Sequence, residues 1–416
     1  MTSTAYYTLT EQNIVEYLST VPAMGMLFDD FSALEVKEVC DGNMNYAFIV
    51  RSKNKDKSSV FVKQTPPYIK VLGKDWPLSR ERMDVEKQAL TYQAQVCPTM
   101  SPKLYYSCSA MSVIIMQNLS QHLLLRNALI ARQSLPKLAS HMSSYLANTL
   151  FYSSAFAEGN KYQPTKLSNQ AMCQITQAFV FTYPFEGHET NNYNPSLCQN
   201  VIDSIQKDPT VRMHIGQMKW AFASKNEALI HGDLHTGSIM VNENDTYIID
   251  PEFAFMGPIG FDIGAFIANL YVNYFAQKHT ANPSSESYAT SLLSLIETVW
   301  LEFETKFLSL WQKHDNHPDN TAFIGDHLGV ELAHSDFREW FMQTILSDTM
   351  GFAAVKMMRR ILGVAKVADV MQFENNEQRA KLEAQILRFA REMLLTRNTH
   401  RDFSSLNATH ILNNDK

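Results

Sequence analysis

Residues 230–241 read IHGDLHTGSIMV, and nine residues later the chain continues with DPEF at 250–253. The first segment places Asp233 in a turn beside a glycine, and an apolar run leaves that turn in the manner of a short strand. The second segment follows another apolar run and begins with the carboxylate of Asp250. Between the two runs, residues 242–245 have the side chains typical of a tight turn. The pattern therefore predicts a β-hairpin across 239–250 with an acidic residue beside each strand.

Two carboxylates at the ends of adjacent hairpin strands form a site for one hydroxyl group and one or two divalent cations. Phosphoryl transfer from ATP needs such a site, because the acceptor hydroxyl must be oriented and the phosphate charge must be neutralised. Asp233 and Asp250 therefore predict a phosphotransferase that uses ATP and Mg²⁺.

Composition limits the classes of protein to be considered. The chain has 416 residues, of which 45% are hydrophobic and 19% charged, a balance typical of a globular protein. This length suits two or three domains, or one kinase-sized unit of two lobes. The net charge is −6 and no basic run is present, which argues against a nucleic-acid partner.

Cysteine usage and hydropathy bear on the compartment. The five cysteines form no CxxC pair, so they predict reduced thiols rather than a zinc site or a disulfide framework. The N-terminus lacks the basic start and apolar core of a signal peptide. No apolar run approaches the eighteen or so residues of a membrane helix. We therefore expect a soluble cytoplasmic protein without a membrane partner.

The first 118 residues predict a small α+β lobe. A short helix is expected at 9–20 with Thr10 as its N-cap. Strand-like periodicity follows, and then a helical pattern at 82–95 in which apolar residues share one face. The predicted strands are 35–40, 45–51, 59–64 and 113–116.

Residues 119–416 predict a larger lobe that is mostly helical, apart from the hairpin. The polar tail from about residue 398 is expected to be loosely ordered. Helical spacing occurs at 136–150, 171–181, 197–206, 265–276, 288–314, 338–362 and 376–395.

Several weaker signals in the first lobe have two interpretations each. The turn at 41–46, which includes Asn45, predicts an ordinary hairpin turn or backbone N–H groups lying over phosphates. Lys63 stands inside an apolar strand, where either an edge lysine or a phosphate-binding lysine fits. Glu86, in the following helix, is either a solvated residue or the partner of Lys63.

Three further signals lie at element ends. Met116, Gln117 and Asn118 end the last strand of the small lobe, where an adenine would meet hinge backbone groups. Arg359 and Arg360 precede a glycine near a helix end, where cations need no functional explanation. The segment 257–262 predicts a Gly/Pro loop with Asp262 as the N-cap of the next helix.

The order of these signals resembles the protein-kinase-like superfamily, and most closely its small-molecule branch, in which aminoglycoside and choline kinases carry HGDLH or HxD loops. One departure narrows the family. The metal-binding Asn five residues after the loop aspartate is replaced by Ser238, and Asp-Phe-Gly is replaced by the sequence at 250–252. A carboxylate at Glu252 compensates for the lost ligand, if alternate residues of an extended segment face the same way.

HGDLHTGSIM together with DPEFAFMGPIGFDIG is similar to the S-methyl-5-thioribose kinases of methionine salvage. The segment 64–77 and the arginine pair resemble that family as well, and the resemblance covers residues 35 to 365. It implies a bilobal protein-kinase-like α+β fold. It also implies a small-molecule substrate and a homodimer as the partners of the chain.

The resemblance also assigns roles. The γ-phosphoryl group of ATP would move to the anomeric hydroxyl of methylthioribose, with Asp233 orienting that hydroxyl or accepting its proton. Arg359 or Arg360 would neutralise the charge on the moving group, and both would contact the substrate. The residues expected to bind the nucleotide and its Mg²⁺ are Asn45, Lys63, Met116, Gln117, Asn118, Asp250, Pro251 and Glu252, with Asp250 and Glu252 as the metal ligands.

Two alternatives remain open from the sequence. One is another kinase of the same fold, acting on an aminoglycoside, choline, homoserine or a fructosamine; an arginine pair at the acceptor site would repel the cationic members of this group. The other is a nucleotide-binding scaffold without catalysis, which need not retain Lys63, Asp233 and Asp250 together.

Overall fold

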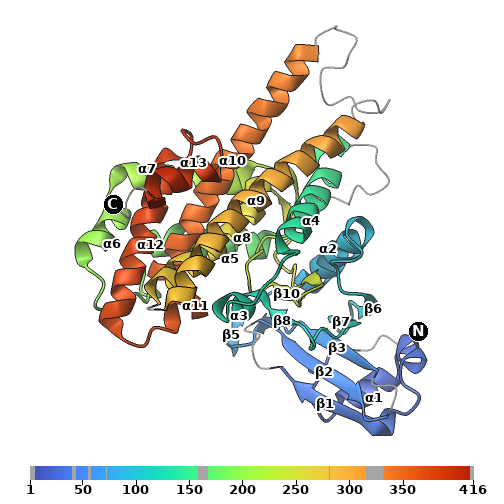
Figure 1. Cartoon of the computed structure of the whole chain (residues 1–416). Helices are drawn as coiled ribbons and strands as arrows, with labels where there is room; N and C mark the ends of the chain where they lie inside the picture. The colour runs from blue at the N-terminus through green and yellow to red at the C-terminus, as the bar shows by residue number, and fades with distance from the viewer. Residues whose placement is uncertain are drawn as a thin grey trace.

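The N-terminal lobe is built on a five-stranded antiparallel sheet with the strand order β1-β2-β3-β7-β6 (Figure 1). The computed structural model describes residues 5–39, 44–54, 58–71, 73–157, 167–280, 282–314 and 331–412. The strands are β1 Leu34–Glu38, β2 Tyr46–Ser52, β3 Ser59–Gln64, β6 Leu104–Cys108 and β7 Val113–Gln117.

The two faces of this sheet are covered by different helices. On one face, Phe48 and Val62 belong to a core that includes α1 (Ile14–Ser19). On the other face, Phe61 packs against α2 (Arg82–Val96). Because side chains alternate along a strand, Lys63 projects from the same face as Phe61 and therefore toward α2.

Short strands join the two lobes and carry the predicted hairpin. Ile239 pairs with Ile248, and residues 244 and 245 donate their N–H groups to the Asn242 side chain at 2.8 and 2.7 Å, which confirms the hairpin and its turn. A strand from just after β7 adds to this hairpin. The hairpin sheet consists of β8 Leu123–Leu124, β10 Ile239–Val241 and β11 Thr246–Ile248. Two further pairs are β4 Tyr68–Ile69 with β5 Gly73–Pro77, and β9 Ala228–Ile230 with β12 Phe255–Gly257.

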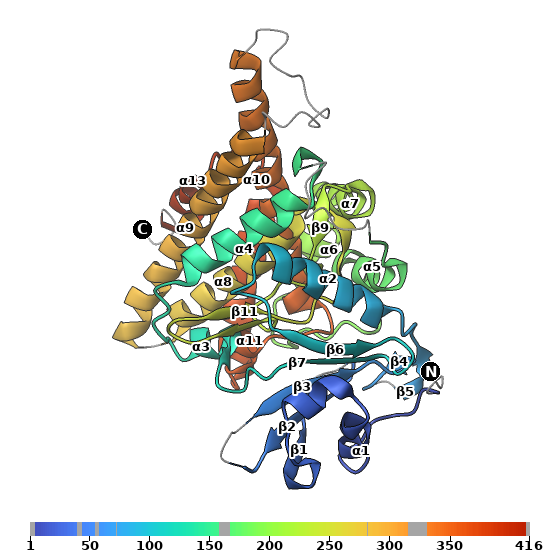
Figure 2. The same cartoon turned by 90° about the vertical axis from the view of Figure 1, so that its right-hand side faces the viewer.

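The C-terminal lobe is helical and is organised around α8, which lies among the other long helices (Figures 1 and 2). Helices α4, α9, α10 and α12 all contact α8, and most of its side chains are buried. The helices are α3 Leu125–Ile130, α4 Leu138–Tyr152, α5 Gln170–Thr176, α6 Gln199–Gln206, α7 Pro209–Ser224, α8 Ile259–His279, α9 Pro283–His314, α10 Glu331–Leu362, α11 Ala368–Met371, α12 Asn376–Thr396 and α13 Phe403–Asn407.

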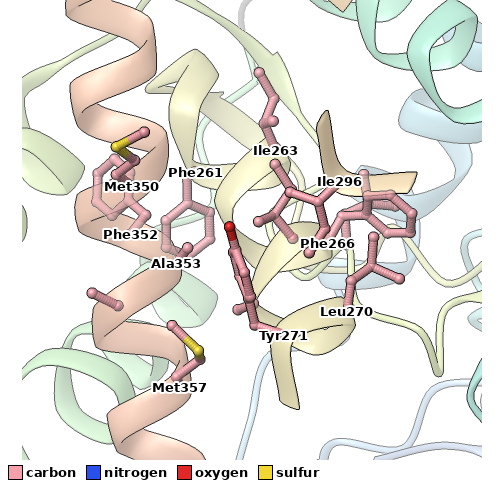
Figure 3. Close-up of a cluster of buried hydrophobic side chains, with 14 of the residues drawn as sticks. Phe261, Ile263, Phe266, Leu270, Tyr271, Ile296, Met350, Phe352, Ala353 and Met357 are labelled. Atoms are coloured by element: carbon pink, nitrogen blue, oxygen red, sulfur yellow. The ribbon is translucent and has the colours of Figure 1, made fainter. Parts of the chain in front are cut away.

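Helices α8 and α10 approach each other closely. Figure 3 shows Phe261 and Tyr271 of α8 facing Phe352 and Met357 of α10. At Gly264 an added Cβ would lie 2.6 Å from the Thr349 carbonyl oxygen, so the two backbones come together only because this position has no side chain.

The predicted α+β architecture, with a sheet in the N-terminal lobe and a larger helical C-terminal lobe, is confirmed. The proposed division at residue 118 stays a prediction. Among the helices of the described residues, none combines the length and apolar character that crossing a bilayer needs.

Some local predictions were wrong. Helix α8 begins at Ile259, with Pro258 in the N-cap position, so Asp262 lies inside the first turn and is not an N-cap. The start of this helix is buried on all sides. It therefore lacks the pattern that marks a surface helix in sequence, apolar residues every three to four positions with polar residues between them. Helix α1 likewise starts later than expected, after Asn13, and Thr10 does not cap it with its side chain.

The C-terminal tail was also predicted incorrectly up to residue 412. Phe403 and Leu406 of α13 are buried, and the Tyr271 hydroxyl donates to Asn407 Oδ1 at 2.7 Å. A π-helical turn, Ala408–Leu412, follows. Tertiary contacts with the helical core therefore order a segment that is polar in sequence.

Replacing Gly264 by Ala is expected to destabilise the protein. The new methyl group would meet the Thr349 carbonyl oxygen and the Ala353 nitrogen, at 2.6 and 2.9 Å, so α8 and α10 must separate. Overpacking of this kind costs roughly 1–3 kcal/mol, which urea denaturation would measure.

Gly216→Ala is the matched control, because Gly216 lies within α7 and an added Cβ there meets nothing within 4 Å. Ala in place of Gly should raise the stability by about 0.4–1 kcal/mol. Equal effects of the two substitutions would refute the close contact between α8 and α10.

Candidate active site

The loop between β9 and β10 carries Asp233, and its backbone has one conformation that only glycine adopts easily. Gly232 has a φ of +81°, and a Cβ at this position would overlap the carbonyl oxygen of Phe253. Glycine is therefore required here both for the left-handed backbone and for the close approach of the 250–253 segment.

Asp262 of α8 holds this loop in place. Its carboxylate accepts the N–H of His231 at 2.6 Å and the N–H of Gly232 at 3.0 Å. The side chain is buried, and this burial raises the pKa of Asp262, while His231 and the two loop N–H groups oppose the rise. The contact ties the 231–233 loop to the central helix of the lobe.

The loop also closes upon itself. His231 Nδ1 accepts the N–H of Asp233 at 3.3 Å, and its Nε2 lies 2.9 Å from the Ile249 carbonyl oxygen. These partners assign the tautomer with the proton on Nε2. The Ser238 hydroxyl donates to the carbonyl oxygen of Asp233 at 3.0 Å. Ser238 therefore has a loop-stabilising contact at the position where related kinases have a metal-binding Asn.

Both oxygens of the Asp233 carboxylate have a neighbour. Oδ1 lies 3.3 Å from Lys356 Nζ, and Oδ2 lies 3.4 Å from His235 Nε2. Because His235 Nδ1 accepts the N–H of Gly237 at 2.8 Å, Nε2 carries the proton that points toward Asp233. Burial raises the pKa of Asp233, but His235, Lys356 and Arg359 outweigh it and hold that pKa well below its usual value.

The neighbours of Asp233 form a cationic cluster. Lys356, Arg359 and Arg360 come from the end of α10, and Arg126 of α3 donates to His235 Nδ1 at 3.3 Å. Burial lowers the pKa of Arg359, which Asp233 opposes. Within the described part of the chain, the buried Nε atoms of Arg126 and Arg359 have no hydrogen-bond partner. The cluster therefore carries more positive charge than the Asp233 carboxylate balances. It also has more N–H groups than this carboxylate can accept hydrogen bonds from.

A second buried cluster surrounds Lys63. Its Nζ lies 2.8 Å from Glu86 of α2, which confirms the expected pair, and it also contacts Asp250. Burial alone would lower the pKa of Lys63, but Asp250, Glu86 and Glu252 together raise it. Burial raises the pKa of Glu86 to about 8, although Lys63 opposes this.

Glu252 connects this cluster to the loop at 41–46 of the N-terminal lobe, called the covering loop because it is predicted to lie over the phosphates. Asn45 Nδ2 donates to Glu252 Oε2 at 2.8 Å, and Arg82 Nε lies 3.6 Å from the same oxygen. From the other side, Asn169 Nδ2 donates to the backbone carbonyl oxygen of Glu252 at 2.8 Å. Residues 41–43 of the covering loop lie outside the described residues, so its predicted backbone contacts with phosphate stay a prediction.

The acidic side chains meet the chemical requirement for a hard divalent cation. Single carboxylate oxygens from Glu86, Asp250 and Glu252 lie within 4.8 Å of one another, and Mg²⁺ prefers oxygen ligands. The expected extended backbone is wrong, however, because Asp250 has a φ of +67° and Ala254 donates its N–H to the Pro251 carbonyl oxygen at 3.1 Å. A turn, rather than strand alternation, brings the two predicted metal ligands together.

A pocket of about 480 Å³ lies beside the end of β7, on the sheet face from which Lys63 projects. Its lining includes Lys37, Ile49 and Ser120. Because paired strand residues share a face, Ile49 faces the same side as Phe61 and hence as Lys63. The pocket is therefore placed to receive a base whose phosphates extend toward Lys63.

The lining of this pocket includes Ser120 but none of the three predicted hinge residues, which lie just before it in the chain. Met116 is buried in β7, and Gln117 Oε1 accepts the N–H of Lys103 at 3.2 Å. Asn118 Nδ2 donates to the Ser59 hydroxyl at 3.1 Å, and Asn118 Oδ1 accepts the N–H of Ser120 at 3.0 Å. The side chains of Gln117 and Asn118 thus stabilise the strand end, which leaves contacts with a base to the backbone.

Sequence reasoning missed several residues of the site. Lys356 precedes Arg359 by three positions, so helical spacing alone would have placed both on one face of α10. His235 lies within the quoted HGDLH motif. No local pattern reveals the site contacts of Arg82, Asp262 or Asn169, because the partners in these contacts are distant in sequence.

Comparisons with known proteins agree with this geometry. The model of the Phosphotransferase enzyme family matches residues 206–283. The chain is 37% identical to methylthioribose kinase 1 of Oryza sativa subsp. japonica, over 96% of this chain and 93% of that protein. It is 36% identical to methylthioribose kinase of Bacillus cereus, over 94% of this chain and 93% of that protein.

Among solved structures, choline kinase from Cryptosporidium parvum Iowa II is similar at 12% identity and a TM-score of 0.49, over 96% of this chain and 99% of that chain. A likeness this distant carries none of the functional argument.

Replacing Asp262 by Asn should loosen the loop that carries Asp233. An amide has one acceptor oxygen, so one of the N–H groups of His231 and Gly232 would lose its partner, at a cost of about 1–3 kcal/mol. Amide hydrogen exchange of residues 230–238, together with urea denaturation, would measure both consequences. Faster exchange in this segment is expected.

Asp208→Asn is the control, because Asp208 also accepts two backbone N–H groups, those of Thr210 and Val211, at the start of α7. Asn caps helices about as well as Asp, so exchange in residues 230–238 should remain unchanged. Unaltered exchange in the Asp262→Asn protein would contradict the role of Asp262 in holding the loop.

Proposed function

This chain belongs to the methylthioribose kinase family, and we propose that it transfers the γ-phosphoryl group of ATP to the 1-hydroxyl of S-methyl-5-thio-D-ribose. The products are S-methyl-5-thio-α-D-ribose 1-phosphate and ADP, and the reaction belongs to methionine salvage. The observation that carries the proposal is 36–37% identity to methylthioribose kinases over nearly the whole chain. The contacts of Asp233 with His235 and Lys356 support it.

Asp233 orients the acceptor hydroxyl and receives its proton late in the reaction. Its depressed pKa makes it a weak base toward a neutral hydroxyl. In a loose transition state the acceptor oxygen forms little bond to phosphorus, so orientation contributes more than early proton removal. The constrained loop supplies that orientation before the substrate arrives.

The nucleotide extends from the pocket beside β7 toward Lys63. Backbone groups of Met116, Gln117 and Asn118 meet the base, and Lys63 neutralises the non-transferred phosphates. Asn45, with its loop, covers the phosphates. Its contact with Glu252 places this cover beside the acidic cluster.

Asp250 and Glu252 are the proposed ligands of Mg²⁺, with Pro251 between them as part of the nucleotide-binding turn. When bound, Mg²⁺ supplies charge neutralisation at the phosphates. Lys63 holds Asp250, while Asn45 and Arg82 hold Glu252, so each proposed ligand has a preset direction. Ser238 is at most an indirect contributor.

Arg359 and Arg360 are proposed to stabilise the charge on the transferring group and to contact the substrate. Adjacent helical residues point about 100° apart, so only one of them aims straight at that group. Arg360 Nη1 donates to the Ala365 carbonyl oxygen at 3.4 Å, whereas the Nε of Arg359 has no partner within the described residues. This difference favours Arg359 for the moving phosphoryl group.

The cationic cluster also bears on the acceptor. An aminoglycoside or choline would be repelled by Lys356, Arg359 and Arg360, whereas a neutral thiosugar would not be. A homodimer and a cytoplasmic location are further proposals, carried by the family resemblance and by the sequence composition.

An acceptor screen with Mg-ATP tests the proposed function. Purified protein should phosphorylate methylthioribose in preference to choline, homoserine and kanamycin. Asp233→Asn should lower kcat on the order of 10²–10⁴-fold, because the amide keeps the shape but loses the charge and proton affinity. ATP affinity, measured by calorimetry, should be nearly unchanged.

Asp245→Asn is the matched control, because Asp245 lies in the turn of the same hairpin and is half-exposed. Its kcat should equal that of the parent. Preference of the parent for another acceptor would reject the substrate assignment, and near-normal kcat of the Asp233→Asn protein would reject the role of Asp233.

The metal assignment predicts a specific change in Mg²⁺ dependence. Glu252→Gln should raise the Mg²⁺ concentration needed for half-maximal activity, because a carboxylate ligand is lost. Ser238→Ala should leave it unchanged. Activity measured across a Mg²⁺ titration at saturating ATP would separate the two variants.

Asn45→Ala controls for the hydrogen bond that Glu252 makes with the covering loop. This variant should weaken ATP binding without altering the Mg²⁺ requirement. If Glu252→Gln titrates with Mg²⁺ like the parent, Glu252 holds the covering loop and is not a metal ligand.

A further inference from the structure

We propose that Lys356 is a positioning residue for phosphoryl transfer, whose ammonium group fixes one oxygen of Asp233 so that the rest of the carboxylate faces the acceptor hydroxyl. The inference rests on the proposed function, in which Asp233 meets that hydroxyl. It adds a third functional side chain to α10, one turn before the arginine pair.

The position of Lys356 is determined by two contacts. Its Nζ lies 3.3 Å from Asp233 Oδ1 and 4.4 Å from the centre of the Phe261 ring. The side chain is only 5% exposed, so the ammonium group has little freedom to move away. An ammonium group against an aromatic face is stabilised most when water is excluded. Lys356 is therefore a fixed donor rather than a mobile surface cation.

The opposite oxygen of Asp233 is occupied as well. His235 Nε2 lies 3.4 Å from Oδ2 and carries the proton that points to it. The two neighbours together prevent rotation of the carboxylate about its terminal bond. Its side chain remains 25% exposed, so the open side is available to an incoming hydroxyl.

The surrounding charges make Lys356 necessary for more than packing. Removing Lys356 leaves the negative charge of Asp233 with Arg359 as its strongest remaining cation and a neutral His235 beside it, since burial lowers the pKa of His235 to about 4. The pKa of Lys356 is lowered to about 8 by burial, against the pull of Asp233, so the amine is mainly charged at pH 7. The other ionisable groups that act on this pair are Arg360, Asp250 and Asp262.

The competing explanation is that Lys356 contacts the transferring phosphate directly and acts independently of Asp233. A double-mutant cycle on kcat separates the two, because a residue that acts only through Asp233 loses its effect when Asp233 is neutral. The four proteins are the parent, Lys356→Met, Asp233→Asn and the double variant. In the double variant neither charge is buried alone, so it remains folded if the single lysine variant does not.

We expect Lys356→Met to lower kcat on the order of 10²-fold at pH 7 through misplacement of the carboxylate. The KM for Mg-ATP should change little. Asp233 must be ionised, so activity falls as the pH drops through its pKa; without the lysine this acid limb should move to higher pH by about 1–3 units. The double variant should have the kcat of Asp233→Asn alone.

Lys225→Met is the matched control, because Lys225 is likewise paired with acids, Asp348 of α10 and Glu227, away from the Asp233 carboxylate. It should lose stability but keep the parental kcat and acid limb. Multiplicative losses in the double variant, or an unmoved acid limb in folded Lys356→Met, would overturn the proposal.

The proposed function itself is tested separately, by the activity of the parent protein toward methylthioribose. If the parent does not phosphorylate methylthioribose, the same cycle and pH profile are measured with the acceptor that the screen identifies, water included. The role of Lys356 is then decided independently of the identity of the acceptor.

Discussion

The hydrogen bonds from the His231 and Gly232 N–H groups to the Asp262 carboxylate are the constraint on which the geometry of the site depends. They attach the loop that carries Asp233 to α8 at a point where water is largely excluded, because Asp262 is 2% exposed. The same helix packs against α10 at a glycine, and α10 carries Lys356 and the arginine pair. A rigid helix pair thus sets the distance between Asp233 and its cations.

The two buried clusters have opposite charge excesses. Around Asp233 lie Lys356, Arg359 and Arg360, while Asp262 acts on Lys356, and Arg126 and Asp369 act on Arg360. Around Lys63, three carboxylates face one lysine and Arg82. In the proposed reaction, a hydrated cation enters the acidic cluster and a phosphoryl group enters the basic one. Each excess of charge is therefore matched by a ligand of opposite charge. Burying so many ions costs stability, and this cost is offset in the proposed reaction when the ligands bind.

Asn45 and Glu252 connect the loop proposed to cover the nucleotide with the turn that bears the proposed metal ligands. The Asn45 amide donates to Glu252 and accepts from the Thr65 hydroxyl at 3.0 Å, so it bridges the residue that follows β3 and the 250–253 turn. Asn169 holds the backbone of that turn from the helical lobe. Glu252 is consequently shared between lobes, and any movement of the covering loop changes the surroundings of a proposed metal ligand.

The sequence by itself determined the features that depend on neighbouring residues. The hairpin at 239–250, the strand that bears Lys63 and the α2 helix that bears Glu86 follow from side-chain periodicity and turn chemistry, which act over a few positions. The HGDLH motif and its departures identified the family, which comparison with curated proteins confirmed. The start of α8 was mispredicted because a helix buried on all sides does not show the 3.6-residue repeat of polar and apolar faces.

Only the tertiary structure decided how the site is held. The Asp262 contact joins residues 31 positions apart, the Lys356 contact 123 and the Asn45 contact 207. Asp250, in a turn with positive φ, contacts Lys63 of the N-terminal lobe, which lies far away in the sequence. Local propensity carries no information on such pairs, because the attraction between the partners can offset the cost of removing them from water only when the distant segments have packed.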